Sequence, residues 1–245
     1  MTTEVITTIG ALRQRFALPR LPRQTLALVP VAGELHDGHV RIIEEARSRA
    51  EAVAVGFLEP PRGNPENDLR LCREAGAGFA FSPSIRDSQS GALLIELVQI
   101  LRPDLVCLSE SDAGLLADIR RGVRYLDIPV TIVAVPTLRE ADGLAVSSGN
   151  WRLRPEERLV APMLYRALRL VAAEIFRGAP SPEAACAKAR EFLAAEPRIR
   201  LESLELLNPD EMTPVTHLRQ PVLIAISAWL GSVRLTDCFP APEFR

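Results

Sequence analysis

The sequence predicts an α/β protein, with a Rossmann-like, doubly wound parallel sheet followed by a smaller C-terminal α+β domain. Short apolar runs with the length of buried strands alternate with helical segments up to about Asn150, as in a parallel sheet covered on both faces. After that point, helical segments come first and strand-like segments follow. The 245 residues, 47% of them hydrophobic, suit one large domain or two modest ones. We expect two domains, at residues 1–153 and 154–245.

The expected sheet begins with a β-α-β unit. Its strands are Thr25 to Val31 and Ala52 to Leu58, and between them His39 to Ala50 carries apolar residues at helical spacing. The alternation then continues with helices over Leu69 to Ala75, Ala92 to Leu101 and Ala113 to Leu126, and with strands over Phe79 to Phe81, Asp104 to Leu108 and Val130 to Val135.

The C-terminal part begins with one long helix, Pro155 to Phe176, because proline suits the first helical turn. A second helix, Pro182 to Ala195, follows the breaker GAPSP. Three strands complete the pattern: Leu201 to Leu207, Val222 to Trp229 and Val233 to Thr236.

Composition and charge argue against a nucleic-acid-binding, membrane-spanning or metal-binding protein. The net charge of -2 gives no electrostatic argument for nucleic acid or an anionic membrane as a partner. No apolar run approaches the ~20 residues that span a bilayer, and the N-terminus lacks the apolar core of a signal peptide. The four cysteines, Cys72, Cys107, Cys186 and Cys238, have no metal-ligand spacing. We therefore expect a cytoplasmic protein with structural thiols and no metal site built from its side chains.

Two of the three histidines, His36 and His39, lie in the stretch VPVAGELHDGHV, where the first strand gives way to a helix. In an open parallel sheet this carboxyl edge is where ligands bind, and a helix N-terminus favours phosphate. Gly33 and Gly38 allow the backbone to approach a ligand closely. Both imidazoles can therefore donate to a phosphate group, in the charged or the neutral form. The alternative is that Asp37 or a histidine only caps the helix.

The sequence LHDGHV resembles the HxGH signature of the nucleotidyltransferase-like superfamily, and most of the chain is similar to the pantothenate synthetase (pantoate–β-alanine ligase) family. That family reads VPTMGxLHxGH where this chain reads VPVAGELHDGH, and VPTxREADGLAxSSRN where this chain reads VPTLREADGLAVSSGN. The similarity continues through RLRPEERLVAPMLYRAL to SAWLGSVRLTD near the C-terminus.

The resemblance implies a two-step ligation. ATP activates a carboxylate as an acyl-adenylate and an amine then attacks it, so the partners are a small carboxylic acid and an amine, with Mg²⁺ helping to carry phosphate charge. It also implies that His36 and His39 are catalytic and that the family's usual homodimer is to be expected. The ATP-binding positions it implies are Ala32, Gly33, Gly38, Val135, Val146, Ser147 and Ser148.

Two positive charges of the family pattern are missing. The motif GEKD aligns with residues 109–112, so that Ser111 replaces a lysine, and Gly149 replaces the arginine of SSRN. Charge-assisted contacts to phosphate are about twice as strong as neutral ones. Loss of both should cost several kcal/mol of transition-state stabilisation unless Arg139, Arg152 or Arg154 compensates.

The acid site is altered as well. The family's NPxQFG loop reads Glu59-Pro60-Pro61-Arg62-Gly63 here, which puts Arg62 where a glutamine contacts pantoate, and a segment containing HFRG is missing before Ala92. Arg62 could pair with a substrate carboxylate. Three hypotheses follow: a divergent ATP-dependent acid–amine ligase with an altered acid site, a pseudoenzyme acting as a nucleotide-binding or regulatory protein, and a plain nucleotidyltransferase. The retained histidines favour the first, and the C-terminal match argues against the third.

Overall fold

Buried strands of the first part of the chain pair side by side in a parallel sheet, as the sequence predicts. The computed structural model describes residues 3–17, 24–59, 64–82, 90–218 and 221–241. The chain divides into two compact units, Met1–Pro136 and Thr137–Arg245. The first unit holds a six-stranded sheet in the order β1-β4-β3-β2-β5-β6. Its strands are β1 (Glu4–Ile6), β2 (Leu26–Val31), β3 (Ala52–Phe57), β4 (Phe79–Phe81), β5 (Leu105–Ser109) and β6 (Thr131–Val135).

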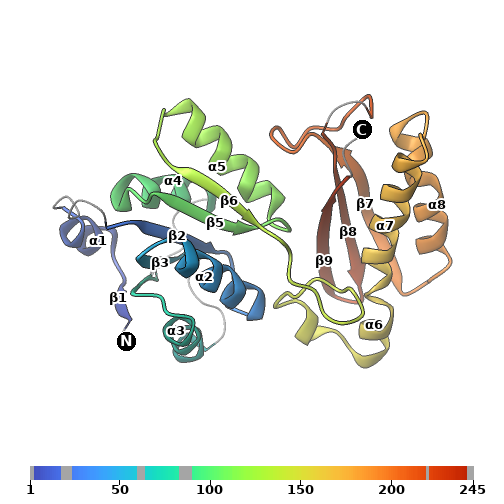
Figure 1. The fold of residues 1–245 in the computed structure, drawn as a ribbon. Helices are drawn as coiled ribbons and strands as arrows, with labels where there is room; N and C mark the ends of the chain where they lie inside the picture. Colours follow the sequence, from blue (N-terminus) through green and yellow to red (C-terminus); the bar gives the residue numbers. More distant parts are fainter. Residues whose placement is uncertain (1–2, 18–23, 60–63, 83–89, 219–220, 242–245) are drawn as a thin grey trace. The chain divides into compact units, whose positions relative to one another are not determined.

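Helices cover both faces of this sheet, which confirms the doubly wound prediction (Figure 1). They are α1 (Ile9–Arg15), α2 (Asp37–Arg49), α3 (Pro65–Glu74), α4 (Ser90–Leu101) and α5 (Ala113–Tyr125). Successive residues of β2 alternate between two cores, since strand side chains point to opposite faces. Leu26 and Leu28 belong to the core shared with α1, α4 and α5, whereas Val29 and Val31 belong to the core shared with α2 and α3.

The strand order places a topological switch point between β2 and β5. From β2 the chain winds to β3 and β4 on one side, then crosses to β5 and β6 on the other. Leu28 lies opposite Val106, so these two neighbouring strands end at the same edge. Crevices for ligands form at such a point, outside the carboxyl ends of the strands.

The second unit packs two helices on a three-stranded antiparallel sheet, β7-β8-β9 (Figure 1). Its elements are η1 (Asn150–Arg152), α6 (Pro155–Val160), α7 (Met163–Phe176), α8 (Pro182–Ala194), β7 (Ile199–Leu207), β8 (Leu223–Leu230) and β9 (Val233–Pro240). Ile224, Ile226 and Ala228, at a period of two along β8, enter the core with residues of α7 and α8. The expected α+β organisation is therefore present.

Two features differ from the sequence prediction. The single helix expected over 155–176 is wrong: it is broken into α6 and α7 around Pro162. Proline lacks the N–H that would bond to Arg158, and its ring clashes with the preceding turn. In addition, β1 and α1 were not predicted, because a three-residue edge strand carries no readable periodicity.

The segment 137–153, expected in the first domain, lies within the second compact unit. Arg139 pairs with Asp237 of β9, and Gly143 approaches Tyr165 of α7. None of the helices in the described ranges combines the length and the apolar character that a bilayer crossing requires.

Candidate functional site

The loop between β2 and α2 ends in a reciprocal cap made by the two histidines. His36 is the N-cap residue of α2, and its Nδ1 accepts a hydrogen bond from the backbone N–H of Gly38 at 3.1 Å. His39 Nδ1 accepts from the backbone N–H of His36 at 3.3 Å. This is a capping box in which imidazoles replace the usual hydroxyl and carboxylate. A histidine does cap the helix, as the alternative interpretation of the sequence proposed. The cap uses only Nδ1 of each ring, however.

The cap fixes the tautomer of both rings. Because each Nδ1 accepts a hydrogen bond from an N–H, each neutral ring carries its proton on Nε2. Within the described residues, no hydrogen bond occupies Nε2 of His36 or His39. The ring centroids lie 4.0 Å apart, so the two Nε2–H donors belong to adjacent rings.

Burial keeps both imidazoles neutral. It lowers the pKa of His36 to about 4, although the neighbouring Asp37 carboxylate acts in the opposite direction. His39 is buried in the protein, and its pKa is lowered well below the ordinary value by burial and then by His36. The sequence left open whether the two imidazoles donate in the charged or the neutral form. Their burial favours the neutral form.

The chain before His36 is suited to a close approach by a ligand. Gly33 has a φ of 90°, a conformation that favours glycine, and a Cβ there would meet no atom within 4 Å. Ala32 is exposed beside it. Gly38 contributes its N–H to the cap of His36, so this N–H is already used.

Asp68 of α3 forms a hydrogen bond to the backbone of this loop. Its Oδ1 accepts a hydrogen bond from the backbone N–H of Leu35 at 3.3 Å, while its Oδ2 is buried without a hydrogen-bond partner. Burial raises the pKa of this carboxyl group, the Leu35 N–H lowers it, and the nearby Glu34 raises it. Buried side-chain oxygens are usually hydrogen-bonded, so this unpartnered oxygen beside the histidine loop is unusual.

The end of β5 lies next to β2 and carries a second set of polar groups. Ser109 Oγ and Ser111 Oγ are 2.7 Å apart, and Ser109 Oγ also accepts from the backbone N–H of Ser111. Asp112 is the N-cap residue of α5, but its side chain makes no capping bond. Burial raises the pKa of Asp112 to about 6. Perturbed carboxyl groups of this kind gather at functional sites.

Val135 ends the neighbouring strand β6 at the same level, opposite Ser109. Its carbonyl accepts a hydrogen bond from the backbone N–H of Glu110 at 2.8 Å, and its side chain is buried. The first unit thus brings the loop 32–39, the Ser109–Asp112 segment and Val135 to one edge of the sheet.

In the second unit, Val146, Ser147 and Ser148 follow a turn held by a polar network. Ser147 Oγ bonds to Oδ1 of the buried Asn150 at 2.9 Å, and Asn150 Nδ2 bonds to Glu140 Oε1 and to the Ala145 carbonyl. The backbone N–H of Val146 bonds to the Leu138 carbonyl.

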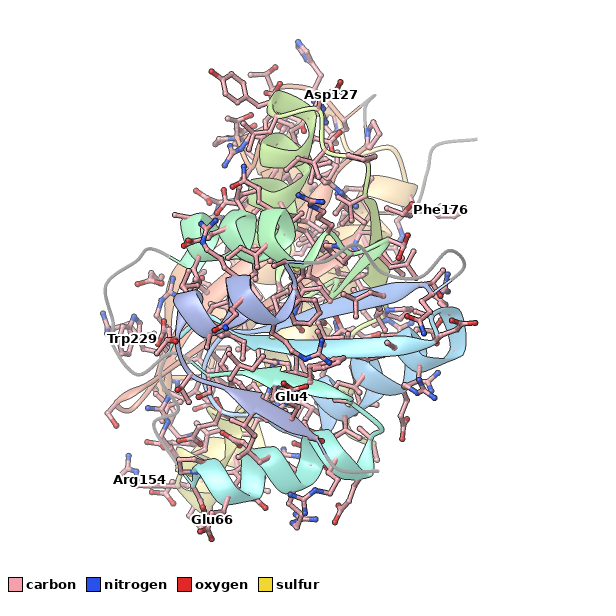
Figure 2. All side chains as sticks on the ribbon, turned by 90° about the vertical axis from the view of Figure 1, so that its left-hand side faces the viewer. Glu4, Glu66, Asp127, Arg154, Phe176 and Trp229 are labelled. Carbon is pink, nitrogen blue, oxygen red and sulfur yellow. The ribbon has the colours of Figure 1, made fainter. Side chains whose placement is uncertain are left out.

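Two of the three arginines that could replace the missing cations are already engaged. Arg139 forms two hydrogen bonds to the Asp237 carboxylate, at 2.7 and 3.1 Å, and lies 4.0 Å from the centre of the Tyr165 ring. Arg154 pairs with Glu157 at 2.7 Å, and its side chain projects from the surface (Figure 2). Arg152 makes no ion pair or hydrogen bond through its side chain within the described residues.

Arg62, the predicted substrate-binding residue, lies outside the described residues. In the described ranges, no group of three His, Cys, Asp or Glu side chains could hold a metal ion. Magnesium is commonly held by one or two carboxylates together with substrate phosphates. The unpartnered oxygen of Asp68 fits this kind of binding, in which the ion arrives with the nucleotide.

Asp68 and Asp112 are the candidate residues that sequence reasoning missed. Asp112 was identified only as part of an aligned motif, and its position at the end of a buried strand could have marked it. Asp68 lies inside an ordinary amphipathic helix, 33 residues from the loop residue it bonds. Nothing in the local sequence indicates that contact.

Comparisons with known proteins agree with this fold. The family model described as pantoate-beta-alanine ligase matches residues 4–88 and 91–240. The pantothenate synthetase of Rhizobium rhizogenes is 33% identical over 96% of this chain and 94% of that protein. The bifunctional pantoate ligase/cytidylate kinase of Synechococcus sp. (strain JA-3-3Ab) is also 33% identical, and the chain spans about half (51%) of its length.

Solved structures extend the similarity to three dimensions. A pantothenate synthetase structure from Thermus thermophilus superposes with a TM-score of 0.80 at 28% identity, over 98% of this chain and 99% of that one. The pantoate-beta-alanine ligase of Francisella tularensis, solved in complex with an ATP compound and β-alanine, shares the fold with a TM-score of 0.73 at 21% identity, over 98% of both chains. The match of the family model over nearly all of the sequence shows that this chain belongs to the pantoate–β-alanine ligase family.

Proposed function

We propose that this chain is an ATP-dependent ligase that joins a carboxylic acid to an amine through an acyl-adenylate, with an acid site altered from the family pattern. The observation that carries the proposal is the histidine pair. Both rings are fixed through Nδ1, and both present a neutral Nε2–H at the switch point of the sheet.

The chemistry required of these donors follows from the reaction. A carboxylate oxygen attacks the α-phosphorus of ATP, the bond to the bridging oxygen breaks, and pyrophosphate leaves. The amine then attacks the carbonyl carbon, AMP leaves, and the nitrogen loses a proton to solvent. Negative charge on the phosphate oxygens is largest during the first step, and preorganised donors that face this charge stabilise it.

His36 and His39 are the residues to which we assign this role. As neutral donors they need no counter-ion and can be buried at small cost, whereas a buried, unpaired cation is expensive. The pair stays in one arrangement because each ring is tied to the backbone N–H of the helix cap. Little reorganisation is then needed when charge develops.

The remaining nucleotide contacts are proposed by position. Ala32, Gly33 and Gly38 line the loop, Val135 ends the neighbouring strand, and the carboxylate of Asp112 lies at a strand end of the kind that binds ribose hydroxyls in Rossmann folds. In the second unit we propose Val146, Ser147 and Ser148 as nucleotide contacts. Mg²⁺ bound with ATP would neutralise phosphate charge, and Asp68 is the residue that would contact it.

The binding site for the acid differs most from the family pattern. Arg62 replaces a glutamine that the family resemblance assigns to pantoate, and an arginine pairs readily with carboxylates. We propose that Arg62 contacts the carboxylate of an acid that differs from pantoate.

A second candidate function is a nucleotide-binding protein that has lost ligation. The observation that favours it is Ser111, which stands where the family has a lysine and bonds to Ser109. With Arg139 engaged by Asp237, this arginine supplies no replacement charge.

ATP–pyrophosphate exchange distinguishes the two candidates. The purified chain is assayed with Mg²⁺, ATP and a panel of small carboxylic acids that includes pantoate. We expect exchange with at least one acid, reduced by about 10²–10³-fold in His39→Ala because a preorganised donor is lost. His217→Ala, which changes the third and exposed histidine, is the matched control and should leave exchange unchanged. Exchange with none of the acids, together with ATP binding in calorimetry, would refute the ligase and favour the second candidate.

A further inference from the structure

The short helix η1 presents two exposed side chains from a piece of backbone that is held at both ends. The buried amide of Asn150 donates through Nδ2 to the Ala145 carbonyl at 2.9 Å. Leu153, just after the helix, packs against the core of the second unit. Between these two anchors, Trp151 and Arg152 are exposed. Both side chains therefore extend from a fixed turn.

The guanidinium of Arg152 pairs with no carboxylate within the described ranges. Three other arginines close to it in the sequence each hold a carboxylate, in the pairs Arg139–Asp237, Arg154–Glu157 and Arg158–Glu140. A guanidinium without a counter-ion on the protein is available to an anion from solution, and phosphate is an anion that it binds well.

Arg152 lies one turn after Gly149, the position at which the family pattern has an arginine. The Arg152 backbone N–H bonds to the Gly149 carbonyl at 3.1 Å, and Gly149 has helical φ and ψ angles of -66° and -32°. In a 3₁₀ turn, side chains three residues apart project from the same side of the helix. Arg152 therefore leaves the helix on the side where an arginine at position 149 would begin.

The space beside Gly149 is already filled. A Cβ at this position would lie 3.2 Å from Leu235 Cδ2 and 3.3 Å from Ser147 Oγ. Both distances are shorter than the optimal separation of non-bonded carbon atoms, so the stem of an arginine would force one of these groups to move. A positive charge at this turn is therefore supplied with less strain from position 152.

We propose that Arg152 makes a charged contact from η1 to a phosphate oxygen of the nucleotide, in place of the arginine that this chain lacks at position 149. The inference rests on the proposed function and makes it more specific, because it assigns one cation of this chain to the nucleotide. The turn rises only about 6 Å over three residues, a length that an extended arginine side chain spans.

Substitutions that remove or keep this charge test the assignment through the affinity for MgATP in calorimetry. Arg152→Gln should weaken binding about tenfold, the effect of one charged hydrogen bond. It should leave the melting temperature unchanged, because no other described residue holds this side chain. Arg152→Lys keeps the charge and should weaken binding less than about threefold. Arg169→Gln, the matched control at an exposed arginine of α7, should leave the affinity unchanged.

Salt dependence provides a second measurement that a change in shape would not move. Raising the ionic strength from about 0.05 M to about 0.5 M screens exposed charges. The affinity of the unsubstituted chain for MgATP should therefore fall more steeply with salt than that of Arg152→Gln.

The assignment is overturned if Arg152→Gln binds MgATP as tightly as the unsubstituted chain, or if Arg169→Gln weakens binding to the same extent. Equal losses in Arg152→Lys and Arg152→Gln would also overturn it, since the charge would then not be what binds. Failure of the unsubstituted chain to bind MgATP is a different result, because it overturns the proposed function as well.

Discussion

Loss of stability in acid is the measurement most sensitive to the surroundings of His36. Burial lowers its pKa to about 4 in the folded protein, against an ordinary value of 6.5. The folded state therefore holds this proton more weakly than the unfolded state does. As pH falls through 6.5, the unfolded chain takes up the proton first, and stability is lost until the pH reaches about 4.

The magnitude follows from the difference between the two pKa values. At about 1.4 kcal/mol for each unit of pKa difference, the full effect is about 3.5 kcal/mol, of which about 2.5 kcal/mol is lost by about pH 4.5. His36→Asn keeps a side-chain oxygen that can accept from the Gly38 N–H, as a good N-cap residue does, but it removes the titration.

Urea unfolding at about pH 7.5 and about pH 4.5 measures the effect. The unsubstituted chain should lose about 2.5 kcal/mol more than His36→Asn between these two conditions. His217→Asn makes the same chemical change at an exposed position and should behave like the unsubstituted chain. Equal acid losses in the unsubstituted chain and in His36→Asn would show that the ring is not desolvated, and the argument for neutral donors would then fail.

Three further predictions concern an ion pair, a glycine turn and the buried cysteines. Arg139→Ala should lower the free energy of unfolding by about 3 kcal/mol in a urea titration, because it leaves the buried Asp237 carboxylate unpaired, and a loss below about 1 kcal/mol would contradict this. Gly231→Ala should lower the melting temperature by several degrees, since the φ of 55° is strained and the added Cβ would collide with Glu157. All four cysteines are free and buried, with the pKa of Cys72 raised to about 12, so a thiol reagent at about pH 8 should label them rapidly only in denaturant.

The sequence was sufficient for the parallel sheet because its strands are buried on both faces. Segments such as Leu26–Val31 read as continuous apolar runs, and the alternation with helices leaves few other arrangements. The segment 155–176 reads as one helix because apolar periodicity is preserved across Pro162, although the backbone is not.

The site was predictable where its chemistry is local and not where it depends on distant contacts. The histidines form their cap within four residues, so their place at a helix start could be read directly. The pairing of Arg139 with Asp237 joins residues 98 positions apart, and no local pattern shows that this arginine is unavailable. The orientation of the buried Asn150 amide likewise depends on its hydrogen bond to Glu140, ten positions away.

The histidine pair also limits how much charge this edge of the sheet can supply. Ser111 bonds to Ser109 and supplies no positive charge where the family pattern has a lysine. A phosphate near Nε2 raises the pKa of either ring, since a nearby anion favours the protonated form. The two centroids are only 4.0 Å apart, however, and His36 already lowers the pKa of His39. Protonation of one ring therefore opposes protonation of the other. In the proposed function, Mg²⁺ bound with ATP would therefore balance much of the remaining triphosphate charge.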